Sequence, residues 1–154
     1  PYLSGERSPV GDAQVRGVMM GLGHETERNT LTHGVLDALA FAFKDNMEAL
    51  EEGGAKINRL MAVGGGTKSE LWLKIIATVL GIPIDLPAAG DVGGAFGAAR
   101  MGLVAATGED FRKVFTKPKV ARTITPEKAA KAAYDDQFQR YKQIYPAIKE
   151  IKLS

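Results

Sequence analysis

The chain has no cysteine in its 154 residues, and this absence excludes disulfide bonds and thiolate chemistry. A protein without cysteine is compatible with the cytoplasm, which we predict as its location. No apolar run approaches the length of a membrane-spanning helix, so we expect no membrane partner. An excess of one charge is also lacking, because 20 basic residues stand against 18 acidic ones. Since nucleic-acid-binding proteins usually concentrate positive charge, we expect no nucleic-acid partner.

The composition that is present is that of a globular domain. Hydrophobic residues make up 45% of the chain and charged residues 25%, which is usual for folded proteins. A length of 154 residues is sufficient for one domain with a buried core. The chain begins at Pro1 without a methionine, and we therefore expect a fragment or a processed product.

Three consecutive glycines, Gly64, Gly65 and Gly66, form the most informative local pattern. The apolar residues 59–63 before them predict a short buried strand, and a helix is predicted after them. Bare glycine backbone beside a helix N-terminus offers unpaired N–H groups and a partial positive charge, which suit a phosphate or another anion. Alternatively, the glycines only satisfy a positive φ or let helix and strand pack closely. The local pattern leaves both interpretations open.

The remaining elements alternate along the chain. Residues 1–28 are rich in glycine and predict a loop region. Asn29 is the predicted N-cap of a long helix that ends at Gly53 and Gly54. The apolar stripe of this helix consists of Leu31, Val35, Leu36, Leu39, Phe43, Met47 and Leu50.

The second half of the core is predicted from capping signals. Thr67 and Glu70 have the spacing of a capping box, so the helix after the glycines should begin at Thr67 and end at Gly81. Residues 82–86 predict a second strand. Asp91 is the predicted cap of a third helix that ends near Ala106, before Gly108.

A basic segment, residues 112–122, is predicted to be a solvated linker to a last helix. Thr125 caps that helix, with Pro126 at its first position and Pro146 at its end. The aromatic residues on one face are expected in the core or on a docking surface; they are Tyr134, Phe138, Tyr141 and Tyr145.

The predicted order of elements indicates an α/β fold with parallel strands. Residues 29–108 form an αβαβα core, and residues 125–146 form a C-terminal helix. Two strands make a small sheet, so we expect that the rest of the sheet is supplied from elsewhere. The third helix is poor in side chains, and we expect close packing at Gly97 and a greater chance of a ligand at residues 91–94.

Four stretches of the sequence are informative in combination. They are PYLSGERSP at residues 1–9, GVMMGL at 17–22 with NTLTHGVLDA at 29–38, VGGGTKSELW at 63–72, and GDVGGAFGAAR at 90–100. Together they resemble the C-terminal part of the FGGY family of carbohydrate kinases, and among its members the pentulose kinases. Three mild departures, Asp37, Ala38 and the pair Thr67–Lys68, leave gluconate and ribulose kinases as alternatives.

This resemblance implies the C-terminal portion of a ribonuclease-H-like domain of the actin/Hsp70 ATPase type, with a parallel βαβα core and extra helices. It implies binding of ATP or ADP, with Gly64, Gly65 and Gly66 approaching the nucleotide and Ser69 beside the adenine or ribose. The catalytic base, the sugar site and most of the Mg²⁺ site belong to the part of such kinases that precedes this region. We therefore predict no catalytic and no metal-binding residue in this chain, and no activity of the chain alone.

Two other classes of function remain as alternatives. Gly64 and Gly66 after a strand, with Asp85 about twenty residues on, are compatible with a dinucleotide-binding unit. The chain could instead be a non-catalytic interaction module that pairs with a complementary chain or forms a homodimer. His24 and His33 stand nine residues apart without other ligands at metal-binding spacing, so no metal site is expected.

Overall fold

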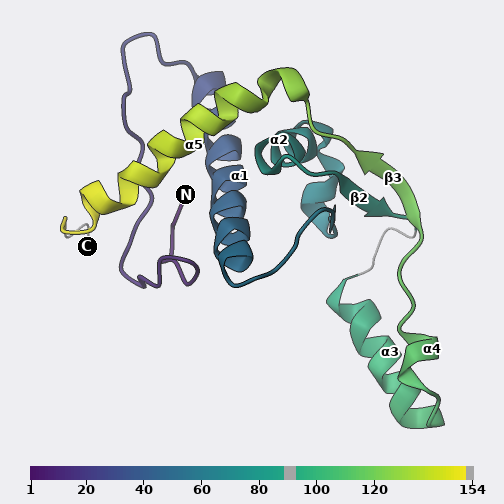
Figure 1. The fold of residues 1–154 in the computed structure, drawn as a ribbon. Coiled ribbons are helices and arrows are strands. Elements are labelled where there is room, and N and C mark those ends of the chain that lie inside the picture. The colour runs from purple at the N-terminus through teal and green to yellow at the C-terminus, as the bar shows by residue number, and fades with distance from the viewer. Residues whose placement is uncertain (89–92, 152–154) are drawn as a thin grey trace.

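The computed structural model describes residues 1–88 and 93–151, in which helices and strands alternate (Figure 1). Asp91, the predicted cap of the third helix, lies outside the described residues. No helix in the described ranges is long and apolar enough to cross a membrane. The elements are α1 Arg28–Glu52, β1 Leu60–Met61, the 3-10 helix η1 Gly65–Lys68, α2 Glu70–Leu80, β2 Ile84–Pro87, α3 Gly94–Thr107, α4 Phe111–Val114, β3 Val120–Ile124 and α5 Lys128–Ile148.

Helix α2 is the centre of the core. It packs against α1, α5 and β3, and most of its residues are apolar and buried. At its C-terminus Gly81 adopts φ 74°, a left-handed conformation that favours glycine, and its N–H donates to the Ala77 carbonyl at 2.9 Å. The predicted end of this helix is therefore confirmed. Its buried residues are Leu73, Ile75, Ile76, Ala77, Thr78, Val79 and Leu80.

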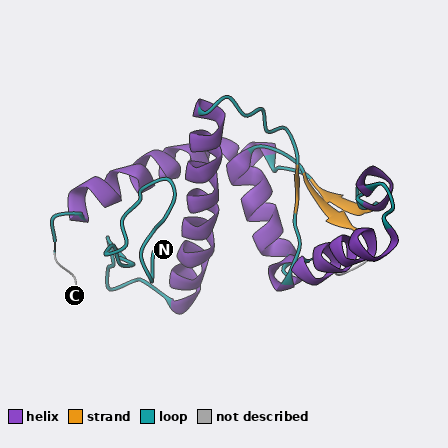
Figure 2. Cartoon of the chain, turned by 90° about the horizontal axis from the view of Figure 1, so that it is seen from below, coloured by secondary structure: helices purple, strands orange, loops and turns teal. Residues whose placement is uncertain are grey.

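The described sheet has three strands in the order β1-β2-β3 and is mixed (Figure 2). Strands β1 and β2 are parallel, as predicted, and Leu60 pairs with Ile84. Strand β3 runs antiparallel to β2, with Ile124 opposite Ile84. The prediction of a linker over residues 112–122 is thus wrong, because this segment contains most of α4 and most of β3. Four of the five β3 residues are exposed, so the strand shows no alternation of buried and polar residues.

Strand β1 is shorter and more open than predicted. We expected a buried strand over residues 59–63, but the strand contains only Leu60 and Met61, each 37% exposed. The physical reason is its place in the sheet, because among the described strands only β2 pairs with β1. An edge strand leaves one side of its backbone and part of its side chains uncovered.

The helix N-caps of α1, α2 and α5 each differ from the predicted caps by two residues. Helix α1 follows Glu27 instead of Asn29, and α5 follows Glu127 instead of Thr125; neither glutamate side chain makes a capping hydrogen bond. Tertiary contacts anchor α5 instead, because the Glu127 N–H donates to the Thr78 hydroxyl of α2 at 3.0 Å. The prediction that α5 ends at Pro146 is wrong, because the helix continues to Ile148. Only two helical residues follow Pro146, so the lost N–H donor and the crowding by its ring affect the last turn alone.

The two long helices meet through an aromatic cluster. Phe138 of α5 is fully buried, with its ring centroid 5.9 Å from that of Phe41 on α1 and 6.1 Å from that of Tyr141. Tyr134 lies edge-on to Phe41 at 6.3 Å. The aromatic face predicted for the last helix is therefore part of the core rather than a docking surface.

The apolar stripe predicted for α1 is divided between core and surface. Leu36 and Met47 pack against the core, whereas Val35, Phe43 and Leu50 are exposed. The buried α1 residues belong to an adjacent face, because α1 contacts both α2 and α5. One side of α1 therefore presents large apolar side chains to solvent.

The loop region at the N-terminus is ordered by contacts with α5. The predicted loop is confirmed, since no helix or strand is assigned before Arg28. The hydroxyl groups of Tyr2 and Tyr141 lie 2.6 Å apart, and the Tyr145 hydroxyl donates to the Asp12 carboxylate at 3.2 Å. In Figure 1 this loop runs beside α1 and crosses α5, with parts of it on both sides of that helix.

Helices α3 and α4 lie beyond the sheet, away from α1 and α5 (Figure 1). The expectation of close packing at Gly97 is wrong for the described residues, because a Cβ built there would meet no atom within 4 Å. Gly108, with φ 68°, ends α3 as predicted. Arg100 of α3 donates to the Thr116 carbonyl at 3.0 Å and so links α3 to the segment after α4.

We predict that Phe138→Ala destabilises the chain by about 3–5 kcal/mol, because it leaves a cavity at the junction of α1 and α5. Urea denaturation followed by circular dichroism measures the change. Gln139→Ala, at an exposed position on the same helix, is the control and should change the free energy of unfolding by less than about 0.5 kcal/mol. Equal stability of the two variants would contradict the aromatic cluster as the link between the helices.

Candidate functional site

The three glycines form a tight turn between β1 and α2. Gly64 adopts φ 95° and ψ −178°, a region open essentially only to glycine. Its carbonyl accepts hydrogen bonds from the N–H of Thr67 at 3.1 Å and from the Thr67 hydroxyl at 2.7 Å. Gly64 is therefore required by the backbone of the turn itself, and Thr67 closes the turn instead of capping α2 as predicted.

Gly66 is required by packing. A Cβ built on Gly66 would collide with the Trp72 ring of the first turn of α2. The ring centroid of Trp72 also lies 6.4 Å from the ring centroid of Phe43 on α1. The sequence predicts Trp72 on the apolar face of this helix, but its contact with Gly66 was not predicted, because it depends on how the turn folds back on α2.

Within the described residues, neither backbone conformation nor packing requires a glycine at position 65. Its φ is not positive, and a Cβ built there would meet no atom within 4 Å. Among the described residues no hydrogen bond to the N–H groups of Gly64, Gly65 or Gly66 is present. The exposed face of the turn thus carries bare backbone donors, which is the arrangement that suits an anionic group.

Ser69 is the N-cap of α2. Its hydroxyl oxygen accepts a hydrogen bond from the Trp72 N–H at 3.3 Å, and the residue is exposed. The hydroxyl hydrogen can still be donated to an acceptor outside the chain. The four predicted site residues, Gly64, Gly65, Gly66 and Ser69, therefore lie together at the N-terminal end of α2, where the helix dipole is positive.

A buried carboxylate fixes the strand that leads into the turn. Asp85 of β2 is 4% exposed, and its two oxygens contact the Arg59 guanidinium at 3.1 Å and the Thr123 hydroxyl at 2.6 Å. The Asp85 carbonyl also accepts the N–H of Ala62 at 2.9 Å. Asp85 thus contacts the residues on both sides of β1, Arg59 and Ala62, and the second of these lies two residues before Gly64. Both Asp85 oxygens are engaged inside the chain, which speaks against the ribose-binding role of the dinucleotide alternative.

A hollow of about 490 Å³ lies beside the turn. Its lining is mostly apolar and comes from α1, β1, η1 and α2, including the exposed side chains Phe43, Leu50 and Leu60. Gly66 and Trp72 form the side next to the turn. The Trp72 indole N–H is buried without a hydrogen-bond partner in the part of the chain that the structure describes.

In the part of the chain that the structure describes, the small-residue segment of α3 is not placed in contact with the glycine turn. Gly93 is the N-cap of α3, without a side-chain hydrogen bond, and Gly94 is open like Gly97. Gly90 and Asp91 lie outside the described residues. The expectation that residues 91–94 approach a ligand therefore stays a prediction.

Comparison with known proteins decides the family. The profile of the FGGY family of carbohydrate kinases, C-terminal domain, matches residues 1–106. The chain belongs to this family of kinases. Xylulose kinase of Escherichia coli K12 is 34% identical over 146 residues, which cover 94% of the chain and 30% of that protein. The chain thus spans about a third of the length of the curated relatives it matches.

Solved structures of FGGY kinases share the fold. The crystal structure of a xyloylose kinase from Brucella ovis is 55% identical with a TM-score of 0.88, covering 96% of this chain and 31% of that one. Gluconate kinase from Lactobacillus acidophilus is 25% identical with a TM-score of 0.80, covering 99% and 31%. The chain is therefore an α/β part of the fold of the FGGY sugar kinases, which is ribonuclease-H-like and of the actin/Hsp70 type, and β3 makes its described sheet mixed rather than parallel as predicted. This family membership excludes the dinucleotide-binding alternative.

We predict that alanine substitutions at two neighbouring glycines change the stability of the chain by different amounts. Gly66→Ala forces the Trp72 ring away and should destabilise the chain by about 1–3 kcal/mol. Gly65→Ala meets open space and should change the free energy of unfolding by less than about 0.5 kcal/mol. Trp72 is the single tryptophan of the chain, so its emission reports the displacement directly. Identical emission spectra for Gly66→Ala and the unchanged chain would contradict the contact.

Proposed function

We propose that the chain is the ATP-binding C-terminal portion of a sugar kinase that transfers the γ-phosphate of ATP to a hydroxyl of D-xylulose. The observation that carries this proposal is the open face at Gly65, which no contact among the described residues explains, in a chain of the FGGY family. In this proposal the bare backbone of Gly65 leaves room for the nucleotide. Gly64 and Gly66 give the turn its shape.

The residues of the chain bind and orient the nucleotide rather than react with it. Backbone N–H groups of the turn and the positive end of α2 favour negative charge. The Ser69 hydroxyl can donate a hydrogen bond while it caps the helix. Lys68 is exposed, and we assign it no role in phosphate binding. ATP supplies the phosphoryl group, and phosphoryl transfer depends mainly on positioning and charge neutralisation.

The remaining parts of the reaction are assigned to the region that precedes this one in longer FGGY kinases. We propose that the sugar site, the catalytic base and most Mg²⁺ ligands lie there, and that this chain alone is inactive. The choice of D-xylulose rests on the names of the relatives, with D-gluconate and D-ribulose as the competing substrates. We also propose that the kinase is cytoplasmic.

Calorimetric titration with Mg-ADP tests the nucleotide site, with NAD as the parallel ligand. The chain should bind ADP and not NAD, and Gly65→Val should reduce ADP affinity at least about tenfold because its side chain occupies the open face. Gly34→Val is the matched control, since Gly34 of α1 is equally open but distant from the turn in sequence and lies on another element. This variant should bind ADP like the unchanged chain.

The outcomes separate the proposals. Preferential binding of NAD, or equal ADP affinity of Gly65→Val, would overturn the assigned site. If neither nucleotide binds, the titration is repeated after mixing with the complementary N-terminal part of a related xylulose kinase. ATP-dependent phosphorylation of D-xylulose in that mixture, at a rate above those for D-ribulose and D-gluconate, supports the proposed substrate.

The exposed apolar side of α1 and β1 favours a covering partner. Phe43, Leu50 and Leu60 border one hollow, and exposed apolar surface of this kind is usually covered in a functional assembly. We propose that the rest of the domain covers it, with a homodimer as the second candidate. Sedimentation of the chain alone should then show a monomer that dimerises weakly, and Leu60→Lys should abolish any dimer. A dimer that persists in Leu60→Lys would place the contact elsewhere.

A further inference from the structure

The acidic residue in the first turn of α2 is Glu70. It directly follows Ser69, so its carboxylate belongs to the same helix end that the glycine turn adjoins. A negative charge is favourable at a helix N-terminus, and Glu70 therefore competes with an anionic ligand for that environment. Without a compensating charge, this carboxylate would repel the phosphates of a nucleotide bound at the turn.

Arg122 of β3 supplies the compensating charge. Its guanidinium lies 2.6 Å from the Glu70 carboxylate, and both side chains are more than half exposed. An ion pair that is exposed to this extent adds little to stability. The sequence predicts that Glu70 completes a capping box with Thr67, but Thr67 bonds to Gly64 and the carboxylate pairs with Arg122 instead. The pair therefore acts on the local charge rather than on the fold.

The sheet places Arg122 at the edge where the glycine turn lies. Strands β1 and β2 are parallel, so their carboxyl ends share one edge, and the turn follows β1 at that edge. Arg122 pairs with Leu86, the residue before the last one of β2. Open α/β sheets bind ligands at the carboxyl ends of their parallel strands. Arg122 and the candidate nucleotide site therefore lie at the same end of the sheet.

The other basic side chains near the start of α2 do not pair with its carboxylate. Lys74, one turn further along the helix, donates to the Thr125 carbonyl at 3.1 Å. Lys68 of η1 is exposed, and within residues 1–88 and 93–151 no carboxylate lies within ion-pair distance of it. Among the described residues, Arg122 is thus the cation that pairs with Glu70.

We propose that Arg122 is a specificity-determining residue of the nucleotide site, because it cancels the charge of Glu70 and lets the turn accept a polyphosphate. This inference rests on the proposed function, in which the nucleotide lies at the glycine turn. With Arg122 in place, the backbone N–H groups and the helix end dominate the local potential. Without it, Glu70 opposes them. The pair therefore sets the preference for ADP over adenosine, and its effect grows with the charge of the ligand.

The test compares ADP, AMP and adenosine, which share base and ribose and differ in charge. Calorimetric titrations at about pH 7 and about 0.05 M salt, without Mg²⁺, measure the three affinities. Arg122→Gln should weaken ADP binding about threefold, AMP binding less, and adenosine binding not at all. Glu70→Gln should strengthen ADP binding to a similar extent, although it removes a favourable charge from the helix end and so slightly lowers stability. The double variant should bind ADP like the unchanged chain.

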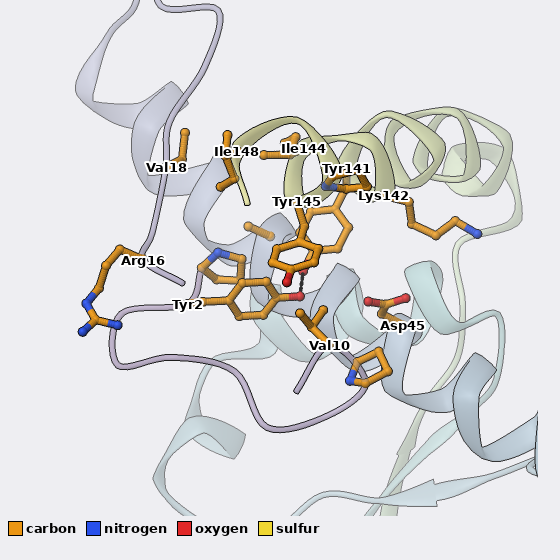
Figure 3. A pocket seen from close by; sticks show the side chains of 14 residues that line it. Tyr2, Val10, Arg16, Val18, Asp45, Tyr141, Lys142, Ile144, Tyr145 and Ile148 are labelled. Atoms are coloured by element: carbon orange, nitrogen blue, oxygen red, sulfur yellow. Dashed lines mark hydrogen bonds between the residues drawn. The ribbon is translucent and has the colours of Figure 1, made fainter. Parts of the chain in front are cut away.

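Lys142→Gln is the matched control, because it removes the same charge from another ion pair. Lys142 lies 3.1 Å from the Glu48 carboxylate and links α5 to α1. Figure 3 shows Lys142 at a pocket between the N-terminal loop, α1 and α5, with its charged end pointing away from the tyrosine rings. The residues that line this pocket are all different from those that line the hollow beside the glycine turn. This variant should bind ADP like the unchanged chain.

The outcomes separate this inference from the proposed function. If Gly65→Val weakens ADP binding but Arg122→Gln does not, the nucleotide site stands and the inference is wrong. Equal losses of ADP and adenosine binding in Arg122→Gln would reveal a merely structural role and also overturn it. So would a double variant that binds ADP as weakly as Arg122→Gln, since Arg122 would then contact the phosphates itself.

Failure of the proposed function has a different signature. In that case Gly65→Val binds ADP like the unchanged chain, and the inference falls with the site. If the chain alone binds no nucleotide, the same variants are compared in the mixture with the complementary N-terminal part of a related xylulose kinase. Absence of ADP binding in that mixture would overturn both.

Discussion

The burial of α2 is the constraint on which the rest of the structure depends. This helix is surrounded by α1, α5 and the sheet, so its position determines where each of them can lie. Its N-terminus carries the glycine turn and the Ser69 cap, while its C-terminus leads through Gly81 into β2. The candidate nucleotide site is therefore attached to the most deeply packed element of the chain, which gives a flexible glycine turn a rigid support.

Features that depend on neighbouring residues could be predicted from the sequence. The glycine turn, the ends of α2 and α3 and the aromatic face of α5 all follow from local chemistry or from helical periodicity. The four site residues lie close together because they are contiguous or nearly so. Their position beside a helix N-terminus was predictable for the same reason, although the role of Ser69 as the N-cap of that helix was not.

Features that depend on distant partners could not be predicted. Strand β3 has one buried residue, Ile124, so its existence depends on pairing with β2 rather than on a pattern of its own. The roles of Asp85 and Trp72 also depend on tertiary contacts, with Arg59 and Thr123 for the carboxylate and with Gly66 for the indole. The start of α5 is fixed by a hydrogen bond from the Glu127 N–H to the Thr78 hydroxyl of α2. Capping rules consider only neighbouring residues, so they could not predict this contact.

The pairing of α1 with α5 has a consequence for synthesis on the ribosome. Lys44 of α1 and Asp135 of α5 form an ion pair although 91 residues separate them. At about 5–20 residues per second, the aromatic side of α1 remains without its partner for roughly 5–18 s. Helices form within about a microsecond but are marginally stable alone in water, so α1 depends first on α2, which is synthesised before α5 and packs against it. Phe41 meets the aromatic side chains of α5 only after that last helix has been synthesised.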